Sequence, residues 1–190
     1  SSGMGGTKEW FRGMKRLSVL ENYTVGRKEE RKMAIDKVKE YFRQFGREED
    51  VQEFSVSSAT VDLAAQALGV EGARIAKSMS FYGKEEGSCV IVVTAGDQKV
   101  DNGKFKHFFG MKAKMLKGED VERLTGHAPG GVCPFCNPDG TKVYLDESMK
   151  RFDTVFPACG SANSAIRLTC QELEQYSGSL EWVDVCRSAV

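Results

Sequence analysis

The amino-acid sequence predicts an α+β fold in which helices pack around a mixed, curved, barrel-like β-sheet. Short segments with the two-residue period of strands alternate irregularly with segments of helical period, whereas a doubly wound fold requires a regular alternation. The chain has 190 residues, which is enough for one domain with a proper core. Its hydrophobic fraction of 41% and charged fraction of 28% are typical of a globular protein.

The first 32 residues differ from the rest of the chain. They hold eight lysines and arginines against four glutamates, and they contain few core-forming residues. Ser1–Gly3 is typical of a cloning remnant. We therefore expect residues 1–32 to form a weakly structured extension and residues 33–190 to form the folded domain.

Two segments near the start of the domain have apolar residues spaced as on one face of a helix. Glycines at positions 46 and 69 end these segments, and Thr60 is a suitable N-cap for the second. The two apolar stripes are formed by Ile35, Val38, Phe42 and Phe45 and by Val61, Ala64, Ala65 and Leu68. We therefore expect helices over residues 33–45 and 61–68.

The remaining elements follow from strand-like alternation, short apolar runs and helix-ending glycines. A strand over residues 51–56 precedes the second helix. The segment 75–81 and the apolar run 88–95 are separated by the turn at 83–87, which predicts a β-hairpin. The other expected elements are helices over 101–109, 118–125 and 170–176 and strands near 142–146, 153–157, 164–168 and 180–185.

One charged residue interrupts the apolar face of the first hairpin strand. Ile75, Met79 and Phe81 share this face with Lys77. Lysine is rarely buried without a partner, so its ammonium either reaches water at a strand end or enters a pocket that receives an anion. The second alternative makes Lys77 the first candidate for a functional residue.

The formal net charge is zero, but it is unevenly distributed. Residues 33–190 hold 19 basic and 23 acidic residues, which argues against broad nonspecific binding to nucleic acid. One run departs from this balance, and it is either a phosphate-facing patch or a solvated face. The run consists of Lys99, Lys104, Lys106, His107, Lys112, Lys114 and Lys117.

The sequence also indicates the cellular compartment in which the protein is expected. No apolar run approaches the ~20 residues of a membrane-spanning helix, and the N-terminus has no apolar signal region. Six cysteines in a chain without an export signal are typical of reduced thiols. We therefore expect a cytoplasmic protein that has no membrane partner.

Cys133 and Cys136 form a CxxC motif. With His127, Cys159 or Cys170 they are one conceivable zinc site, but the sequence has no second CxxC or HxxxH. A turn sequence follows the second cysteine, whereas a redox motif requires the first cysteine at a helix N-terminus. The pattern favours thiols that pack near a pocket, and it predicts neither a metal nor a cofactor.

Four short segments stand out together in the chain. They are Thr60–Gly69, Ile75–Met79, Gly130–Phe135 and Ala158–Asn163. In this order they resemble the YbaK/EbsC family of aminoacyl-tRNA deacylases, which is related to the editing domain inserted in bacterial prolyl-tRNA synthetases. The resemblance covers roughly residues 34–185, and the family fold, a mixed-sheet barrel surrounded by helices, agrees with the predicted class.

The resemblance implies roles for particular residues. Lys77 corresponds to the family's functional lysine, and the backbone at Gly130 and Gly131 lines the pocket beside the scissile ester. The turn containing Gly160, Ser161 and Asn163 forms another pocket wall. Cys133 and Cys136 depart from the family, which often has serine and glycine at these two positions, and the departures bear on pocket polarity and substrate choice.

Two further residues are candidates for substrate binding. Phe54 precedes the loop that leads to the second helix, so it is placed to wall the amino-acid pocket, with core packing as the alternative. Thr60 starts the first matching segment, and its alternative role is capping the helix. Local satisfaction of backbone groups is the corresponding alternative for Ser161 and Asn163.

The chemistry of ester hydrolysis is compatible with these residues. An aminoacyl ester is already activated, so its hydrolysis depends on positioning and charge stabilisation more than on a strong nucleophile. The chain has two histidines and no Ser-His-Asp order with a nucleophile elbow. We expect Lys77 to hold a phosphate or stabilise charge near the ester, and Gly131 to present backbone groups to water or an oxyanion. A group of the substrate then supplies the proton transfer.

The sequence therefore predicts a free-standing deacylase that hydrolyses mischarged tRNA. By resemblance the amino acid is small, as in Cys-tRNA(Pro) or Ala-tRNA(Pro), and serine and proline esters stay open. The expected partners are the aminoacylated acceptor end of tRNA and, as a further candidate, prolyl-tRNA synthetase. The alternative is a catalytically silent module that binds aminoacyl-tRNA or a synthetase.

Overall fold

The computed structural model describes residues 26, 29, 32–56 and 60–190. Its contacts divide the chain into two units, Ser1–Met33 and Ala34–Val190. The extension predicted over residues 1–32 lies almost entirely outside the described residues, and the three of its residues that are described are helical. The second unit contains every predicted site residue.

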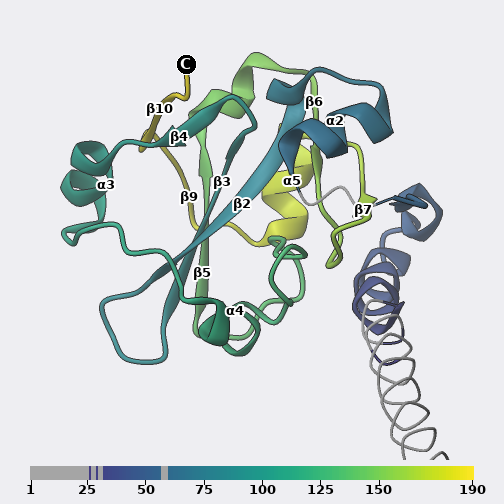
Figure 1. Cartoon of the computed structure of the whole chain (residues 1–190), viewed down its shortest axis with the longest axis horizontal. Helices are drawn as coiled ribbons and strands as arrows, with labels where there is room; N and C mark the ends of the chain where they lie inside the picture. The colour runs from purple at the N-terminus through teal and green to yellow at the C-terminus, as the bar shows by residue number, and fades with distance from the viewer. Residues whose placement is uncertain (1–25, 27–28, 30–31, 57–59) are drawn as a thin grey trace, which may run out of the picture. The chain divides into compact units, whose positions relative to one another are not determined.

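The centre of the second unit is a curved, mixed sheet of six strands in the order β8–β6–β2–β3–β5–β9 (Figure 1). Strands β2 (Ile75–Tyr82) and β3 (Cys89–Ala95) form the predicted antiparallel hairpin, in which Lys77 lies opposite Thr94. Neighbours β2–β6, β3–β5 and β5–β9 are parallel, and β6–β8 is antiparallel. The strands on either side of the hairpin are β5 (Thr141–Asp146), β6 (Thr154–Pro157), β8 (Leu168–Thr169) and β9 (Glu181–Val183).

Helices surround this sheet, and they begin and end where local signals predict. Residues 32–43 are helical. The other α-helices are α2 (Val61–Leu68), α3 (Asn102–Phe109), α4 (Gly118–Thr125) and α5 (Cys170–Ser177). Each of these four is followed by a left-handed glycine, and Thr60 Oγ1 accepts a hydrogen bond from the N–H of Leu63, 3.2 Å away. The predicted α+β class, with helices around a mixed, curved sheet, is confirmed.

Two predicted strands are shorter than expected. The strand predicted over 51–56 consists only of β1 (Gln52–Glu53), which pairs with β7 (Ser164–Ala165) in a separate two-stranded sheet. The strand predicted near 164–168 is divided into β7 and β8, because the chain leaves one sheet and joins another between these two elements. Alternation within one strand carries no information about which sheet its halves join.

One pair of strands was not predicted at all. Strands β4 (Gln98–Val100) and β10 (Cys186–Ser188) form an antiparallel sheet between segments that are far apart in the sequence. The final strand predicted over 180–185 is present in part as β9. The described residues also contain the short 3₁₀ turns η1 (Glu48–Asp50), η2 (Gly72–Arg74) and η3 (Glu147–Arg151).

Strand β3 is buried along its whole length and separates two parts of the core. Ile91 and Val93 pack with Phe42 on one face, and Val90 and Val92 contribute to the cluster on the other. A third, smaller cluster joins α2 to the first residues of β2 and to β6. No helix among the described residues is long and apolar enough to cross a membrane.

Two phenylalanines on the first predicted helical stripe allow a matched test of the core. Phe42 is 0% exposed and Phe45 is 39% exposed. We expect Phe42→Ala to lower the free energy of unfolding by about 3–5 kcal/mol, because it leaves a cavity, and Phe45→Ala to cost clearly less. Chemical denaturation measures both values, and equal losses would contradict this placement of the core.

Candidate functional site

A small cavity lies where α2, the first half of β2, the loop at residues 130–132 and β7 meet. Its volume is about 160 Å³. Three of the predicted site residues, Thr60, Lys77 and Gly130, line it. Most of the remaining lining is apolar and comes from Val61, Ala64, Ile75, Val132, Phe156 and Ala158.

One edge of β2 pairs with β3. The opposite edge is covered at both ends by other segments and is open between them. Ala76 pairs with β6, whereas Ser80 O accepts a hydrogen bond from Leu116 N–H (3.1 Å) in the segment that covers the other end. Alternate residues of a strand direct their N–H and C=O groups to the same edge. Ser78, midway between these two residues, therefore directs both groups toward the cavity, and neither has a partner among the described residues.

Lys77 is half-buried next to this open edge. Its ammonium has no hydrogen-bond or ion-pair partner within the described part of the chain. Burial lowers the pKa of Lys77, and electrostatic interaction with Cys186 and Asp97 partly offsets this effect. Lys77 thus lacks the carboxylate that would make it part of a structural ion pair, which leaves its charge available to an anionic ligand.

The loop at Gly130 contacts the turn at Gly160 through backbone atoms. Both glycines have positive φ, 87° and 91°. A Cβ on Gly131 would lie 2.6 Å from the carbonyl oxygen of Gly160, so only glycine fits at position 131. Gly130 lines the cavity, whereas Gly131 packs against the turn and is not part of the lining. The catalytic role predicted for Gly131 stays a prediction.

The other predicted substrate-binding residues form the support behind the cavity wall. Ser161 Oγ lies 2.8 Å from both Asn163 Oδ1 and Ser164 Oγ. Asn163 Nδ2 donates to Phe54 O (3.0 Å), and Phe54 N–H donates to Asn163 O (2.7 Å). These bonds join the turn to the segment after β1. Phe54, Gly160, Ser161 and Asn163 do not line the cavity, and a substrate contact for them stays a prediction.

His127, which the sequence offered as one conceivable zinc ligand, forms a local hydrogen bond within the glycine-rich loop. It is 2% exposed, and its Nε2 lies 2.6 Å from Phe135 O and 3.3 Å from Cys133 Sγ. Since a carbonyl oxygen only accepts, Nε2 carries the proton, and Nδ1 is a buried acceptor with no partner among the described residues. Burial lowers the pKa of His127. His127 therefore stays neutral and joins the two ends of the glycine-rich loop beneath Gly160.

The cysteines near the cavity are packing residues. Cys133 and Cys159 are buried and Cys136 is half-buried. Burial raises the pKa of all three thiols, that of Cys133 to about 12, which makes them poor nucleophiles and poor metal ligands. Within the described ranges, no cluster of three or more His, Cys, Asp or Glu side chains has the arrangement of a metal site.

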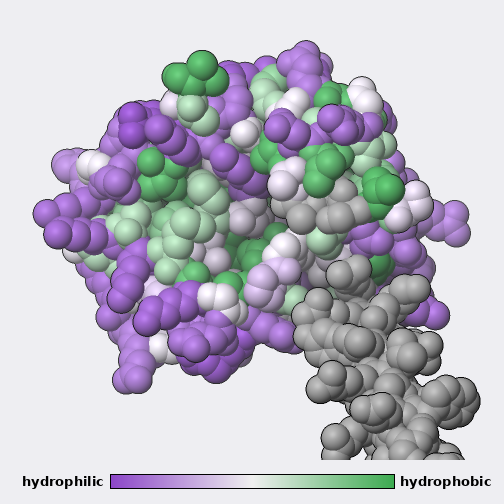
Figure 2. Space-filling model, viewed as in Figure 1, coloured by the Kyte–Doolittle hydropathy of each residue, from purple (hydrophilic) through white to green (hydrophobic). Residues whose placement is uncertain are grey.

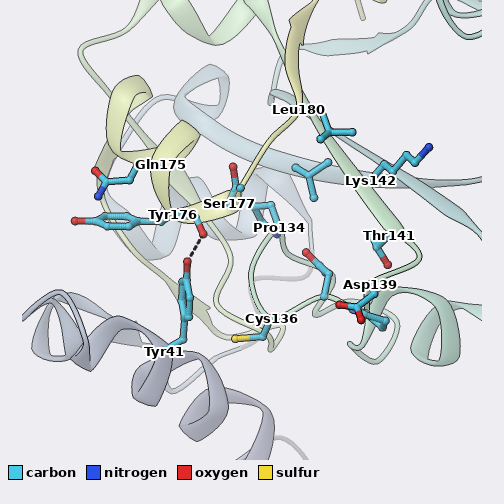
Figure 3. A pocket seen from close by; sticks show the side chains of 14 residues that line it. Tyr41, Pro134, Cys136, Asp139, Thr141, Lys142, Gln175, Tyr176, Ser177 and Leu180 are labelled. Carbon is cyan, nitrogen blue, oxygen red and sulfur yellow. Dashed lines mark hydrogen bonds between the residues drawn. The ribbon is translucent and has the colours of Figure 1, made fainter.

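A larger cavity, of about 520 Å³, lies between the helical residues 34–43, the loop at 134–139 and α5 (Figure 3). On one side the Tyr41 hydroxyl donates to Tyr176 O over 2.6 Å. Cys136, which has a positive φ of 56°, lies beside it. This cavity contains no predicted site residue. The smaller cavity, with its unpaired lysine and open backbone groups, is therefore the candidate site.

The model of the family described as the aminoacyl-tRNA editing domain matches residues 56–176. The chain belongs to this family. The match includes the whole open edge of β2, the loop at Gly130 and the turn at Gly160, and it confirms the resemblance to YbaK/EbsC proteins that the four sequence segments indicated. The editing domain spans most of the second unit.

Relatives of this editing domain cover it to different extents. The uncharacterised protein YwhH of Bacillus subtilis (strain 168) is 53% identical over 155 residues, which are 82% of this chain and 98% of the relative. EbsC of Enterococcus faecalis, described as a candidate Cys-tRNA(Pro)/Cys-tRNA(Cys) deacylase, is 30% identical over 60% of this chain and 70% of its own.

The editing domain is also similar to solved structures. A crystal structure described as a candidate trans-editing enzyme for prolyl-tRNA synthetase superposes with a TM-score of 0.72 at 29% identity. The superposition covers 82% of this chain and 98% of the other. The similarity therefore extends over nearly the whole described domain rather than over isolated motifs.

The buried neutral His127 predicts a pH-dependent stability. Below about pH 6.5 the unfolded chain binds a proton at this residue and the folded chain does not, until the pH reaches the lowered folded pKa. The free energy of unfolding therefore falls as pH decreases in this window, by at most about 1.4 kcal/mol per pH unit.

Denaturation at several pH values tests this in His127→Gln, whose amide replaces the Nε2 donor. We expect this variant to lose the part of the pH dependence of the unfolding free energy that His127 contributes. His107→Gln, which changes the exposed histidine of α3, is the matched control and retains it. The same pH dependence in the wild type and in His127→Gln would contradict the neutral buried state.

Proposed function

We propose that this protein is a hydrolase that deacylates mischarged tRNA, with the aminoacyl group in the 160 Å³ cavity. The observation that carries this proposal is the combination of an unpaired, half-buried Lys77 with the free N–H and C=O groups of Ser78, inside a small apolar cavity of an editing-domain protein. The described names of EbsC and of the trans-editing enzyme support the same activity.

Ser78 has the geometry to hold the aminoacyl group. An aminoacyl ester has the same N–Cα–C=O skeleton as a strand residue, so its amino group can donate to Ser78 O while its carbonyl oxygen accepts from Ser78 N–H. The aminoacyl group thus pairs with the open edge of β2 as a single residue of an added strand would. The donor then lies where negative charge develops when water attacks the ester. The amino-acid side chain is directed out of the sheet plane, toward the apolar lining.

Lys77 supplies the positive charge of the site. Its target is either the terminal phosphate of the tRNA or the charge that develops at the ester, and both need an ammonium without a competing carboxylate. The hydroxyls of Thr60 and Ser164 are already engaged, in the N-cap of α2 and in the turn at Ser161. In this proposal water is the nucleophile, and a group of the substrate carries the proton.

The size and lining of the cavity favour a small aminoacyl group such as alanyl or cysteinyl, and tRNA(Pro) is the proposed carrier. Ala64 and Ala158 leave room near the ester, while Val61 and Phe156 limit the length of the side chain. A hydrophobic pocket distinguishes single methylene groups by only ~1–3 kcal/mol. We propose prolyl-tRNA synthetase as a partner and the cytoplasm, where tRNA is charged, as the place of action.

Lys77→Met tests the lysine because methionine retains the apolar stem without the charge. We expect kcat/KM for deacylation to fall about 100-fold, in the range seen when one charge-stabilising group is removed. The free energy of unfolding should not fall, because burial of the ammonium is unfavourable in the folded state.

A panel of Ala-, Cys-, Ser- and Pro-tRNA(Pro), assayed by release of the amino acid, provides the measurement. Full activity in Lys77→Met would remove Lys77 from the site. Binding of aminoacyl-tRNA by the wild type without turnover of any ester would instead support the silent binding module.

The backbone contact is tested by comparing Ser78→Pro with Ser78→Ala. Proline removes the N–H but no ladder bond, since this N–H faces the open edge of β2. Alanine retains the N–H and removes only the hydroxyl. We expect Ser78→Pro to lower kcat at least 10-fold while Ser78→Ala retains most activity. Equal activity of the two variants, both folded by circular dichroism, would exclude the backbone donor.

A further inference from the structure

A lysine-rich segment lies next to the open edge of β2. Residues 99–117 contain six lysines and one carboxylate, Asp101, although the domain as a whole has an acidic excess. Asp101 accepts a hydrogen bond from Lys104 N–H (2.9 Å) as the N-cap of α3, so it belongs to the helix start. The positive charge is therefore concentrated on one part of the surface.

The segment follows β2 away from the cavity. Leu116 N–H donates to Ser80 O, Met115 forms a β-bridge with Phe81, and Tyr82 N–H donates to Lys114 O. Ser80 is two residues from Ser78, which corresponds to about 7 Å at the rise of a strand. The lysine-bearing segment therefore starts beside the candidate site and continues toward α3.

Most of these lysines are free of carboxylates. Lys104 pairs with Asp184 at 3.0 Å. Within the part of the chain that the structure describes, the other lysines of residues 104–117 form no ion pair. Lys112 and Lys114 are exposed on either side of Ala113, and Met115, which is 63% exposed, follows them. Lys114 Nζ lies over the Tyr82 ring, 5.4 Å from its centroid, and has no carboxylate partner among the described residues. Ammonium groups without carboxylate partners are available to phosphates.

A groove of about 620 Å³ extends this surface between the turn at residues 83–88, the end of α3 and β5. Phe108, which is 40% exposed, lines it, and its ring centroid lies 4.8 Å from that of Phe109 and 5.8 Å from that of Tyr144. Two neighbouring rings thus fix the orientation of an exposed ring. On the same side of the molecule as α3, Figure 2 shows apolar surface bordered by hydrophilic residues.

Lysines also border the groove. Lys84 extends over the end of α3, where a Cβ on Gly110 would lie 3.1 Å from its Nζ, and Lys142 lines the side formed by β5. Glu85 and Asp139 line the groove as well, so its own lining is balanced in charge, and the excess of positive charge comes from the lysines of residues 106–117. A fixed aromatic ring flanked by ammonium groups is the arrangement with which proteins stack a base and bind its phosphates.

We propose that residues 106–117, with Lys84 and Lys142, form the docking surface for a strand of RNA that leaves the cavity. Its phosphates contact the lysines along β2, and one unstacked base lies on Phe108. This inference rests on the proposed deacylase function, because it assigns the ester end of the same RNA to the cavity beside Ser78. The surface therefore explains how an acidic domain retains a polyanionic substrate.

RNA fits this surface better than a protein partner. The exposed apolar residues Phe108 and Met115 are separated in the sequence by Lys112 and Lys114. Lysine is depleted in protein–protein interfaces, whereas a row of unpaired lysines complements a phosphate backbone. Charge complementarity thus selects RNA as the occupant.

The test measures binding of deacylated tRNA as a function of salt, so that the outcome does not depend on hydrolysis. We expect the double variant Lys112→Gln/Lys114→Gln to weaken binding about 10-fold and to reduce the slope of log K against log salt by about 1–2. Phe108→Leu, which retains an apolar side chain for packing, should weaken binding at least 5-fold with little change in the slope.

The matched control is Lys37→Gln/Arg167→Gln, which removes two exposed charges elsewhere and should leave the affinity unchanged. A second readout is hydrolysis of an aminoacyl-adenosine ester, which is too short to reach the lysines. The docking variants should retain wild-type activity on this small ester. Failure of the wild type to hydrolyse any ester would count against the proposed function, while the salt-dependent binding would still decide the docking surface.

Two results would overturn the proposal. One is an unchanged affinity and salt slope for tRNA in both docking variants. The other is normal tRNA binding together with loss of binding to purified prolyl-tRNA synthetase, which would make this face a protein interface.

Discussion

The interruption in the covering of β2 is the feature on which the candidate site depends. Strand β6 pairs with β2 only as far as Ala76, and the segment before α4 pairs with it from Ser80 onward. Backbone N–H and C=O groups at the edge of a buried strand require partners, so folded proteins leave a pair open only where water or a ligand can reach it. The gap thus places a rigid donor and acceptor at the wall of a cavity without any specialised side chain.

Contacts within the two loops around the cavity hold its walls in place on either side of this gap. Gly131 packs against Gly160 at a distance that excludes a side chain, and His127 holds the two ends of the preceding loop together. The bonds among Ser161, Asn163 and Phe54 connect the opposite wall to β1. These groups use their hydrogen-bonding capacity on one another. The cavity is consequently apolar, with one charge and one open backbone residue.

Such a site suits a reaction in which the substrate is already activated. Raising the pKa of the nearby thiols and lowering that of His127 removes the usual nucleophiles and bases from use. In the proposed function, ester hydrolysis depends on orientation, on a backbone donor and on the charge of Lys77. The distribution of surface charge complements this arrangement, because the lysine-bearing segment starts beside the cavity and continues toward α3, while the remainder of the domain is acidic.

Local signals in the sequence predicted the helices, the hairpin and Lys77 as a candidate functional residue. Thr60 and the helix-ending glycines act within one turn of the chain, and the alternation around Lys77 is a property of one strand. The pairing of β4 with β10, the division of the strand near 164–168 and the open groups of Ser78 arise from contacts between distant segments. Only the tertiary structure decided them, because no local pattern records which edge a strand presents or what covers it. For the same reason the sequence did not show that Gly131 packs against the turn at Gly160, about 30 residues away.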